Sequence, residues 1–231
     1  MIFVIAIVTM LVSLFVQWRL KSKFREYSQI PLAKGMSGAE VADYMLRDNG
    51  IHDVRVMSVE GQLTDHYNPM DKTVNLSPDV YNGRNASAVA VAAHECGHAV
   101  QHAQAYGPLM LRSRLVPIQA VSANLLNMIL MIAIFGGAFL SRTFPTNTVL
   151  LVIIACHAVI TLVSLITLPV EFDASRRALA WIDSRGIVSS REHVMAKDAL
   201  KWAALTYVVA ALGALAQLLY YLSLFMGRRD E

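Results

Sequence analysis

Charge is scarce in this chain. Asp, Glu, Lys and Arg make up 16% of its 231 residues, whereas hydrophobic residues make up 55%. Soluble globular domains carry about 25% charged residues, so the composition favours a membrane protein. The net charge is only +3, and no cluster of Lys and Arg is interleaved with aromatic residues. Nucleic-acid binding therefore has no support.

Cysteine is scarce as well. Of the two cysteines, Cys96 lies beside a polar motif and Cys156 lies inside a long hydrophobic run, so we do not expect them to meet. No disulfide framework is indicated, and this usage fits a reducing compartment.

Long runs with little or no charge dominate the rest of the sequence. Four of them are expected to be membrane-spanning helices, at residues 1–18, 116–140, 146–169 and 201–227. At about 1.5 Å per residue, each can cross a hydrocarbon core of about 30 Å, the first only just. The first run lacks both a preceding basic segment and a small-residue cleavage site, so we interpret it as a retained anchor rather than a signal peptide.

Basic residues lie unevenly around these spans. They follow the first span, precede the second and fill the segment between the third and fourth, whereas only Arg142, Arg228 and Arg229 lie on the opposite side. The positive-inside rule then places the amino terminus outside and the segments 19–115 and 170–200 in the cytoplasm.

The first cytoplasmic segment contains the motif His94-Glu95-Cys96-Gly97-His98, which has the form H-E-x-x-H. On a helix, residues four apart share a face, so His94 and His98 can bind one metal ion. Glu95 projects from nearly the same face, where its carboxylate can take a proton from water. Two core histidines satisfied by hydrogen bonds are the alternative, but that alternative leaves a buried charge on Glu95 unexplained.

The surroundings of the motif favour a helix. Asn85 or Ser87 can cap its start, an Ala- and Val-rich run follows, and Gly107-Pro108 interrupts it, so we expect a helix over about 86–105. This setting argues against a chance match of the motif.

The residues before the motif are interpreted as a small soluble unit. Ser37 and Glu40 have the spacing of a capping box for a helix that ends near Asn49. Alternating residues at 53–59 and 72–76 predict two strands, and we expect a short antiparallel sheet. In zinc peptidases such a sheet offers an edge strand to an extended substrate, although a purely structural sheet fits the sequence equally well.

His66 and Tyr67 lie between the two predicted strands. Close to a metal ion, they could polarise the scissile carbonyl or stabilise an oxyanion. The alternative is an Asx-type turn in which polar side chains serve only the loop. Both interpretations stay open at this point.

A catalytic zinc ion usually has three protein ligands, so the motif histidines need a third donor. His102 lies eight residues from the first motif histidine, about 12 Å along a helix, and so cannot share the ion; we expect it to be a supporting or surface residue. His157 lies in the middle of a span. Glu171 follows the third span, which returns beside the motif helix, and is the main candidate, with Asp173 as the fallback and an ordinary helix carboxylate as the alternative.

A further cytoplasmic helix is expected to begin near Ser189. Its His193 could reach the site as a donor to the transition state. Arg176 and Arg177 are explained by the positive-inside rule alone.

Four segments together resemble one protein family. They are His-Glu-Cys-Gly-His-Ala-Val-Gln at 94–101, Asp-His-Tyr-Asn-Pro at 65–69, Val-Asn-Leu-Ser at 74–77 and Glu-Phe-Asp-Ala at 171–174. With the arrangement of spans, they resemble the YugP-like family of bacterial membrane neutral zinc metallopeptidases. More distantly, the chain is similar to the gluzincins, including HtpX-type proteases and CAAX prenyl endopeptidases.

The resemblance implies peptidase chemistry in a bacterial inner membrane, and it implies that Glu171 is the third ligand, since gluzincins bind the metal through the Glu that opens E-x-x-x-D. This chain has Ser175 where that Asp would stand. Because the Asp normally supports a metal-binding histidine from behind, Asp173 or Asp65 is a candidate for its role here.

The combined interpretation is a mainly α, polytopic membrane protein with about four transmembrane helices and a small α+β zincin-like cytoplasmic lobe. With Zn²⁺ held by His94, His98 and Glu171, and Glu95 as the base, it would be a zinc metallopeptidase acting on peptides or membrane proteins at the cytoplasmic membrane surface. The lipid bilayer is its expected environment. The sequence leaves open a homo-oligomer or a regulatory membrane partner.

Two rival interpretations remain. An intramembrane protease would bury the site, but the motif helix is bounded by Arg84 and Gln104 and is too short and polar at its ends to span. A non-catalytic scaffold or adaptor stabilised by zinc would need no base at Glu95 and would normally close the fourth metal position with Cys or His.

Overall fold

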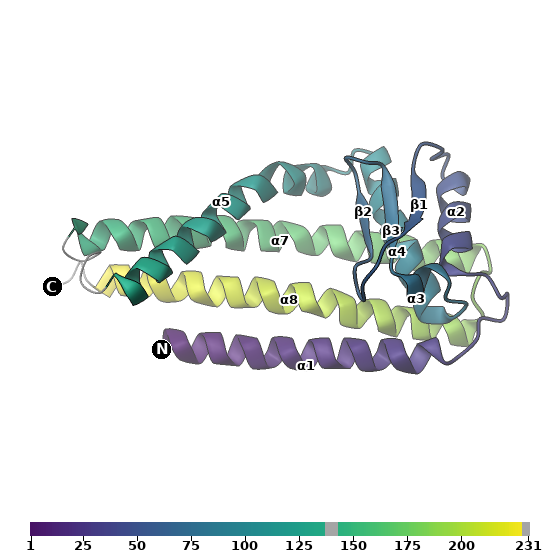
Figure 1. The fold of residues 1–231 in the computed structure, drawn as a ribbon, viewed down its shortest axis with the longest axis horizontal. Helices are drawn as coiled ribbons and strands as arrows, with labels where there is room; N and C mark the ends of the chain where they lie inside the picture. Colours follow the sequence, from purple (N-terminus) through teal and green to yellow (C-terminus); the bar gives the residue numbers. More distant parts are fainter. Residues whose placement is uncertain (137–142, 228–231) are drawn as a thin grey trace. The chain divides into compact units, whose positions relative to one another are not determined.

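A computed structural model describes residues 1–136 and 143–227 (Figure 1). Four described helices are long and apolar enough to cross a membrane: α1 (Ile2–Ser28), α5 (Gly107–Phe135), α7 (Thr146–Ser184) and α8 (Ser190–Gly227). Together with one small sheet, they confirm the mainly α membrane fold class. The predicted end of the second span at 137–140, Arg142, Arg228 and Arg229 lie outside the described residues.

The chain divides into two compact units. The first takes in residues 1–13, the described residues of 111–168, and 207–227; the second takes in 14–110 and 169–206. The boundaries fall inside α1, α5, α7 and α8, so these helices contribute residues to both units.

The second unit is built around α4 (Ala86–Ala103), the helix that carries the motif. Asn85 caps its start by accepting a hydrogen bond from the Ala88 amide at 2.9 Å. The short helices α2 (Gly38–Asp48) and α3 (Pro78–Tyr81) pack against α4. Because small Ala and Val side chains allow close packing on several sides, nearly all of α4 is buried.

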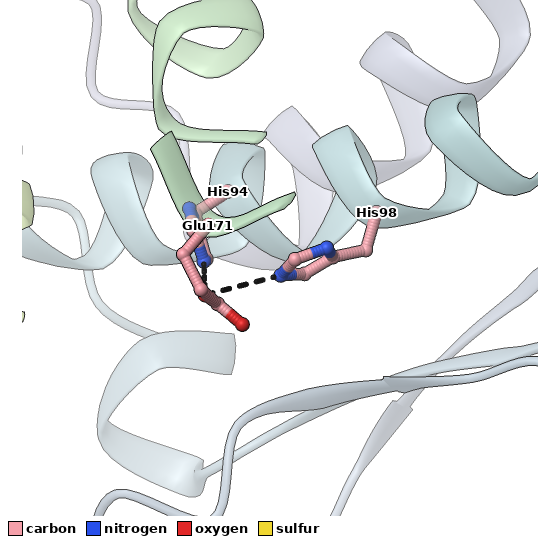
Figure 2. A group of neighbouring side chains, drawn as sticks. All are labelled: His94, His98 and Glu171. Atoms are coloured by element: carbon pink, nitrogen blue, oxygen red, sulfur yellow. Dashed lines mark ion pairs between the residues drawn. The ribbon is translucent and has the colours of Figure 1, made fainter. Parts of the chain in front are cut away.

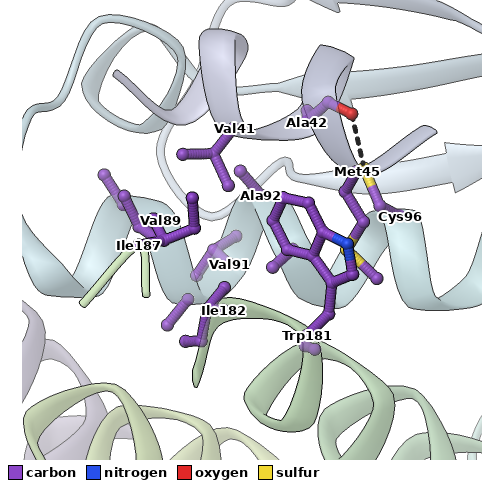
Figure 3. Packing of buried hydrophobic residues seen from close by; sticks show 14 of the residues in the cluster. Val41, Ala42, Met45, Val89, Val91, Ala92, Cys96, Trp181, Ile182 and Ile187 are labelled. Carbon is purple, nitrogen blue, oxygen red and sulfur yellow. Dashed lines mark hydrogen bonds between the residues drawn. The ribbon is translucent and has the colours of Figure 1, made fainter. Parts of the chain in front are cut away.

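The core of the second unit joins α2 and α4 to the end of α7 (Figure 3). The capping box at the start of α2 is complete, since Ser37 and Glu40 each bond the backbone amide of the other. The apolar face of α2 packs on α4 and α7, and Val41, Met45 and Ile182 are among the buried residues.

The sheet of the second unit has three strands: β1 (Arg55–Ser58), β2 (His66–Asn68) and β3 (Thr73–Leu76). Their order is β1-β3-β2; β1 pairs with β3 in parallel and β2 with β3 antiparallel. The expectation of an antiparallel pair at 53–59 and 72–76 is therefore wrong. The chain between β1 and β3 contains β2, at residues where the sequence predicts a loop, and β2 lies on the other side of β3.

In the first unit, α1 and α8 approach closely at Gly213. A Cβ atom built there would lie 2.5 Å from the Thr9 methyl carbon, so Gly lets the two helices approach without displacing the Thr9 side chain.

Candidate metal centre

His94 and His98 lie on one face of α4. Their ring centroids are 4.8 Å apart, and the rings are inclined at 81°. This arrangement follows from the four-residue spacing, because one helical turn brings the two side chains together.

Glu171 reaches the same place from α7 (Figure 2). Its Oε2 atom lies 3.3 Å from His94 Nε2 and 3.5 Å from His98 Nε2, and the residue is only 2% exposed. The two helices come close because of Gly97, where an added Cβ would lie 2.7 Å from the Ala174 carbonyl oxygen. A small residue inside the motif thus brings the third side chain within reach.

The three side chains fit a tetrahedral metal ion. One ligand atom of each lies within 4.8 Å of those of the other two. Zinc bonds to His nitrogen and carboxylate oxygen are about 2.0–2.2 Å long, which places neighbouring ligands of a tetrahedron about 3.3–3.6 Å apart. The Glu171 to histidine distances of 3.3 and 3.5 Å match this separation. Two imidazoles and one carboxylate are also the donors of many catalytic zinc sites.

The electrostatics of the group favour binding of a cation. Burial alone would lower the pKa of His98, but its hydrogen bond to Glu171 and the nearby charge of Glu95 raise it. The carboxylates therefore create a negative potential at the histidine nitrogens, and a divalent cation can take the place of a proton there.

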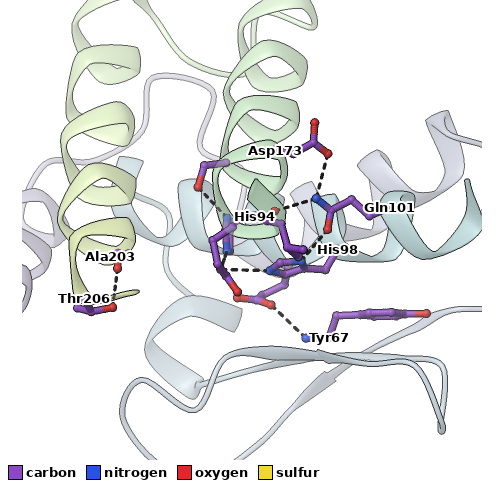
Figure 4. A network of polar contacts seen from close by, with 11 residues as sticks. Tyr67, His94, His98, Gln101, Asp173, Ala203 and Thr206 are labelled. Atoms are coloured by element: carbon purple, nitrogen blue, oxygen red, sulfur yellow. Dashed lines mark hydrogen bonds and ion pairs between the residues drawn. The ribbon is translucent and has the colours of Figure 1, made fainter. Parts of the chain in front are cut away.

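A second layer of hydrogen bonds orients both histidines (Figure 4). Ser175 Oγ lies 3.1 Å from His94 Nδ1, and Gln101 Oε1 lies 3.0 Å from His98 Nδ1. With each Nδ1 engaged outside the group, each Nε2 faces Glu171. This is the arrangement in which second-layer partners fix the tautomer of a metal-binding histidine.

Gln101 also connects the two helices. Its Nε2 donates to the Val170 carbonyl at 2.8 Å and to Asp173 Oδ2 at 2.9 Å, and the residue is fully buried. Asp173, the fallback ligand, accepts a hydrogen bond from Gln101 and forms ion pairs with Arg176 and Arg177. Its carboxylate is therefore engaged by residues other than the two histidines.

Sequence reasoning missed the roles of Gln101 and Ser175. A signal for Gln101 was its position three residues after His98 on the same helix, a spacing at which side chains meet. Ser175 was noted only as a departure from the gluzincin pattern, although its hydroxyl bonds His94. Asp65, the other candidate for that role, accepts hydrogen bonds from the Ser77 amide and hydroxyl.

Glu95 lies beside the edge of the sheet. Its Oε2 accepts a hydrogen bond from the Tyr67 backbone amide at 3.0 Å, and the residue is 8% exposed. The Tyr67 side chain turns away and its hydroxyl bonds His102 Nδ1 at 2.8 Å. In the structure, therefore, the main-chain amide of Tyr67 contacts Glu95, whereas its hydroxyl does not.

The other candidates have different surroundings. His66 is exposed and contacts the Thr64 carbonyl and Asn75. His193 lies in the first turn of α8, and within the described part of the chain its side chain has no hydrogen bond or ion pair. His157 belongs to the first unit, where it stacks on Tyr221. Cys96 donates to the Ala42 carbonyl, away from the metal-binding face.

Comparison with known proteins adds a family to this geometry. The profile of a family described as "putative neutral zinc metallopeptidase" matches residues 2–226. The chain belongs to this family. The chain is also 42% identical to the "putative membrane protease YugP" of Bacillus subtilis (strain 168), a match that covers 95% of this chain and 94% of that protein. No solved structure gives a significant match. The family description and the buried histidine and glutamate group point to the same chemistry.

Proposed function

We propose that this protein is a membrane-embedded, zinc-dependent endopeptidase. It hydrolyses peptide bonds at the cytoplasmic surface of the bacterial inner membrane. One observation carries the proposal: His94, His98 and Glu171 converge from two helices in the geometry of a zinc site, and the Glu95 carboxylate is close enough for its charge to act on His98. The membership in a family described as zinc metallopeptidases supports it.

Zinc, when bound, supplies a Lewis acid that polarises the scissile carbonyl and lowers the pKa of a water molecule. His94, His98 and Glu171 hold the ion, while Ser175 and Gln101 keep both imidazoles oriented. Open coordination fits catalysis, because the described group offers three protein ligands.

Glu95 is the general base and acid of the proposal. It takes the proton of the attacking water and delivers it to the leaving amine. Its bond to the Tyr67 amide holds the carboxylate beside the metal group until substrate and water enter. A structural zinc clamp would have no use for this carboxylate.

The edge strand β2 supports a peptide substrate. Only one side of β2 is paired within the sheet, and the Tyr67 amide on its other side faces Glu95. An extended peptide can add to such an edge by main-chain hydrogen bonds. His66, Tyr67 and His193 remain the candidate donors to the oxyanion, and Tyr67 contacts Glu95 through its main-chain amide.

The cytoplasmic orientation rests on charge. Basic residues gather in the segments 19–25, 112–114 and 176–201, which adjoin or belong to the second unit along the chain. By the positive-inside rule, these segments stay in the cytoplasm.

Zinc content and proteolysis by the purified full-length protein in detergent test the proposal. We expect Glu95→Gln to keep zinc and lose cleavage of an unstructured reporter by at least about a hundredfold, and Glu171→Ala to lose zinc. Glu60→Gln, which changes an exposed Glu, is the control. Wild-type protein that binds zinc but cleaves no better than Glu95→Gln would support the scaffold interpretation instead.

A further inference from the structure

The first unit contains a cavity of about 610 Å³ that the proposed peptidase chemistry does not use. Most of its wall is apolar, but polar side chains from α1, α5, α7 and α8 line it. They are Thr9, Asn127, His157, Gln217 and Tyr221.

These polar residues lie deep in the hydrophobic spans. Thr9, Asn127 and His157 are close to the middle of the first, second and third spans, and Gln217 is near the middle of the fourth. Polar groups at the centre of a bilayer are unfavourable, because hydrocarbon offers them no hydrogen bonds. Because each of the four helices places a polar residue near the middle of its span, these residues together indicate a binding site.

The hydrogen-bonding capacity of this wall is unused. Within residues 1–136 and 143–227, the side chains of Thr9, Asn127 and Gln217 make no hydrogen bond to another residue. His157 is only 9% exposed, and its ring stacks on that of Tyr221 with 5.0 Å between the centroids. Hydrocarbon offers these side chains no hydrogen bonds, so a partner from outside the chain is expected.

The shape of the cavity fits a helix. Its wall runs from Ala123 to Ala133 on α5 and from Ala210 to Tyr221 on α8, lengths of about 15 Å at the rise of an α-helix. Small residues recur along both walls, and Ala214 is one of them. Small residues let the backbone of another transmembrane helix approach closely, and neutral polar side chains then bond across the contact.

We propose that this cavity binds a transmembrane helix of a substrate protein. A neutral amide or hydroxyl side chain of that helix bonds to Asn127, His157 and Gln217. The occupant is neutral because no Asp, Glu, Lys or Arg lines the cavity. Asn127 is exposed and lies at the entrance of the cavity, whereas His157 is buried and lies at its inner end. The binding of a helix does not depend on the proposed peptidase function. Only the identification of that helix as part of a substrate rests on it.

Association in vesicles tests the docking site without any cleavage. Full-length Glu95→Gln protein is placed in phosphatidylcholine vesicles with a dye at its amino terminus. Two synthetic 21-residue Leu/Ala helices with acceptor dyes are compared, one with a central Asn and one with Leu there. We expect three- to tenfold tighter association of the Asn helix, measured by energy transfer.

The variant Asn127→Leu/Gln217→Leu should abolish this preference, and each single substitution should reduce it. Ser223→Leu is the matched control, because Ser223 is exposed and bonds only its own helix. Equal association of both helices with wild-type cavity residues would overturn the proposal and leave the cavity to water or lipid. A preference that survives the double substitution would also overturn it.

A second measurement links docking to cleavage. The reporter is presented either free or joined to the Asn helix, with Glu95 restored. We expect the ratio of tethered to free cleavage rates to fall three- to tenfold in the double variant and to stay unchanged in Ser223→Leu. If neither reporter is cleaved, the peptidase proposal fails, while the association measurement still decides the docking site.

Discussion

Ser175 supports His94 from the side opposite the metal group, with 3.1 Å between Oγ and Nδ1. We expect Ser175→Ala to weaken zinc affinity about 10- to 100-fold, the usual effect of losing such a partner. Ser175→Asp should retain the affinity, because a carboxylate accepts the same Nδ1 hydrogen bond. Competition with a chelator measures both. Ser184→Ala on the same helix is the control, since Ser184 bonds only the carbonyl of Trp181; zinc binding by Ser175→Ala as tight as that of this control would contradict the role.

Gln101 is fully buried and bonds His98, the Val170 carbonyl and Asp173. Replacement by Leu leaves these groups without their partner, and each unsatisfied buried group costs about 1–3 kcal/mol. We therefore expect Gln101→Leu to lower the unfolding temperature of zinc-free protein as well as zinc affinity. Gln62→Leu, which changes an exposed Gln between β1 and β2, is the comparison. Unchanged unfolding of the zinc-free Gln101→Leu protein would show that the bond to α7 does not stabilise the fold.

Cys96 lies on the core side of α4, and burial raises the pKa of its thiol well above the ordinary value. Because the thiolate is the reactive form, a raised pKa means less reaction at a given pH. In a Cys156→Ala background, native protein at pH 8 should react with a disulfide reagent at least about a hundredfold more slowly than unfolded protein. Rapid labelling of native protein would show that this face of α4 is open.

At the scale of elements, the contact between α4 and α7 determines the site. Gly97→Ala should force the helices apart, because its Cβ would lie 2.7 Å from the Ala174 carbonyl oxygen, and so move Glu171 away from the histidines. We expect loss of most zinc binding at stoichiometric metal. Gly107→Ala is the matched control, since nothing lies within 4 Å of a Cβ at that position. Full zinc occupancy in Gly97→Ala would contradict this role of the close approach.

The sequence was sufficient for parts of this arrangement. Capping at Asn85 and the Ala- and Val-rich run predicted the helix of the motif, and the family resemblance selected Glu171, which the structure brings to His94 and His98. Helical periodicity is a local property, so it can be read from neighbouring residues.

Other parts could not be predicted because they depend on contacts between distant segments. The strand β2 has three residues, too few for an alternating pattern, and it occupies one edge of β3 while β1 pairs in parallel with the other edge. The Ser175 to His94 bond joins residues 81 positions apart. Such pairs depend on how α7 packs on α4, which no local pattern specifies.

At the scale of the whole molecule, metal binding and stability should be coupled. Ligands of the proposed zinc ion come from both α4 and α7, so zinc binds the folded chain in preference to the unfolded one. At free zinc 100 times the Kd, the gain is about 2.7 kcal/mol, or on the order of 5–10 °C in unfolding temperature. Scanning calorimetry with zinc and after chelation measures it. Glu171→Ala should show no such difference, and a wild type without one would argue against a zinc site.

The shortness of β2 limits how firmly this protein can hold a free peptide. The free edge of this three-residue strand offers at most two main-chain hydrogen bonds to an incoming strand, from the amide and carbonyl of Tyr67. Each is worth about 0.5–1.5 kcal/mol, which by itself corresponds to an affinity weaker than millimolar. Free peptides should therefore be weakly discriminated by sequence. Turnover would instead depend on how long a protein resides in the same membrane, because lateral confinement raises the effective concentration of its cytoplasmic segments. Selection would then act on the lifetime of an encounter rather than on the residues that are cut.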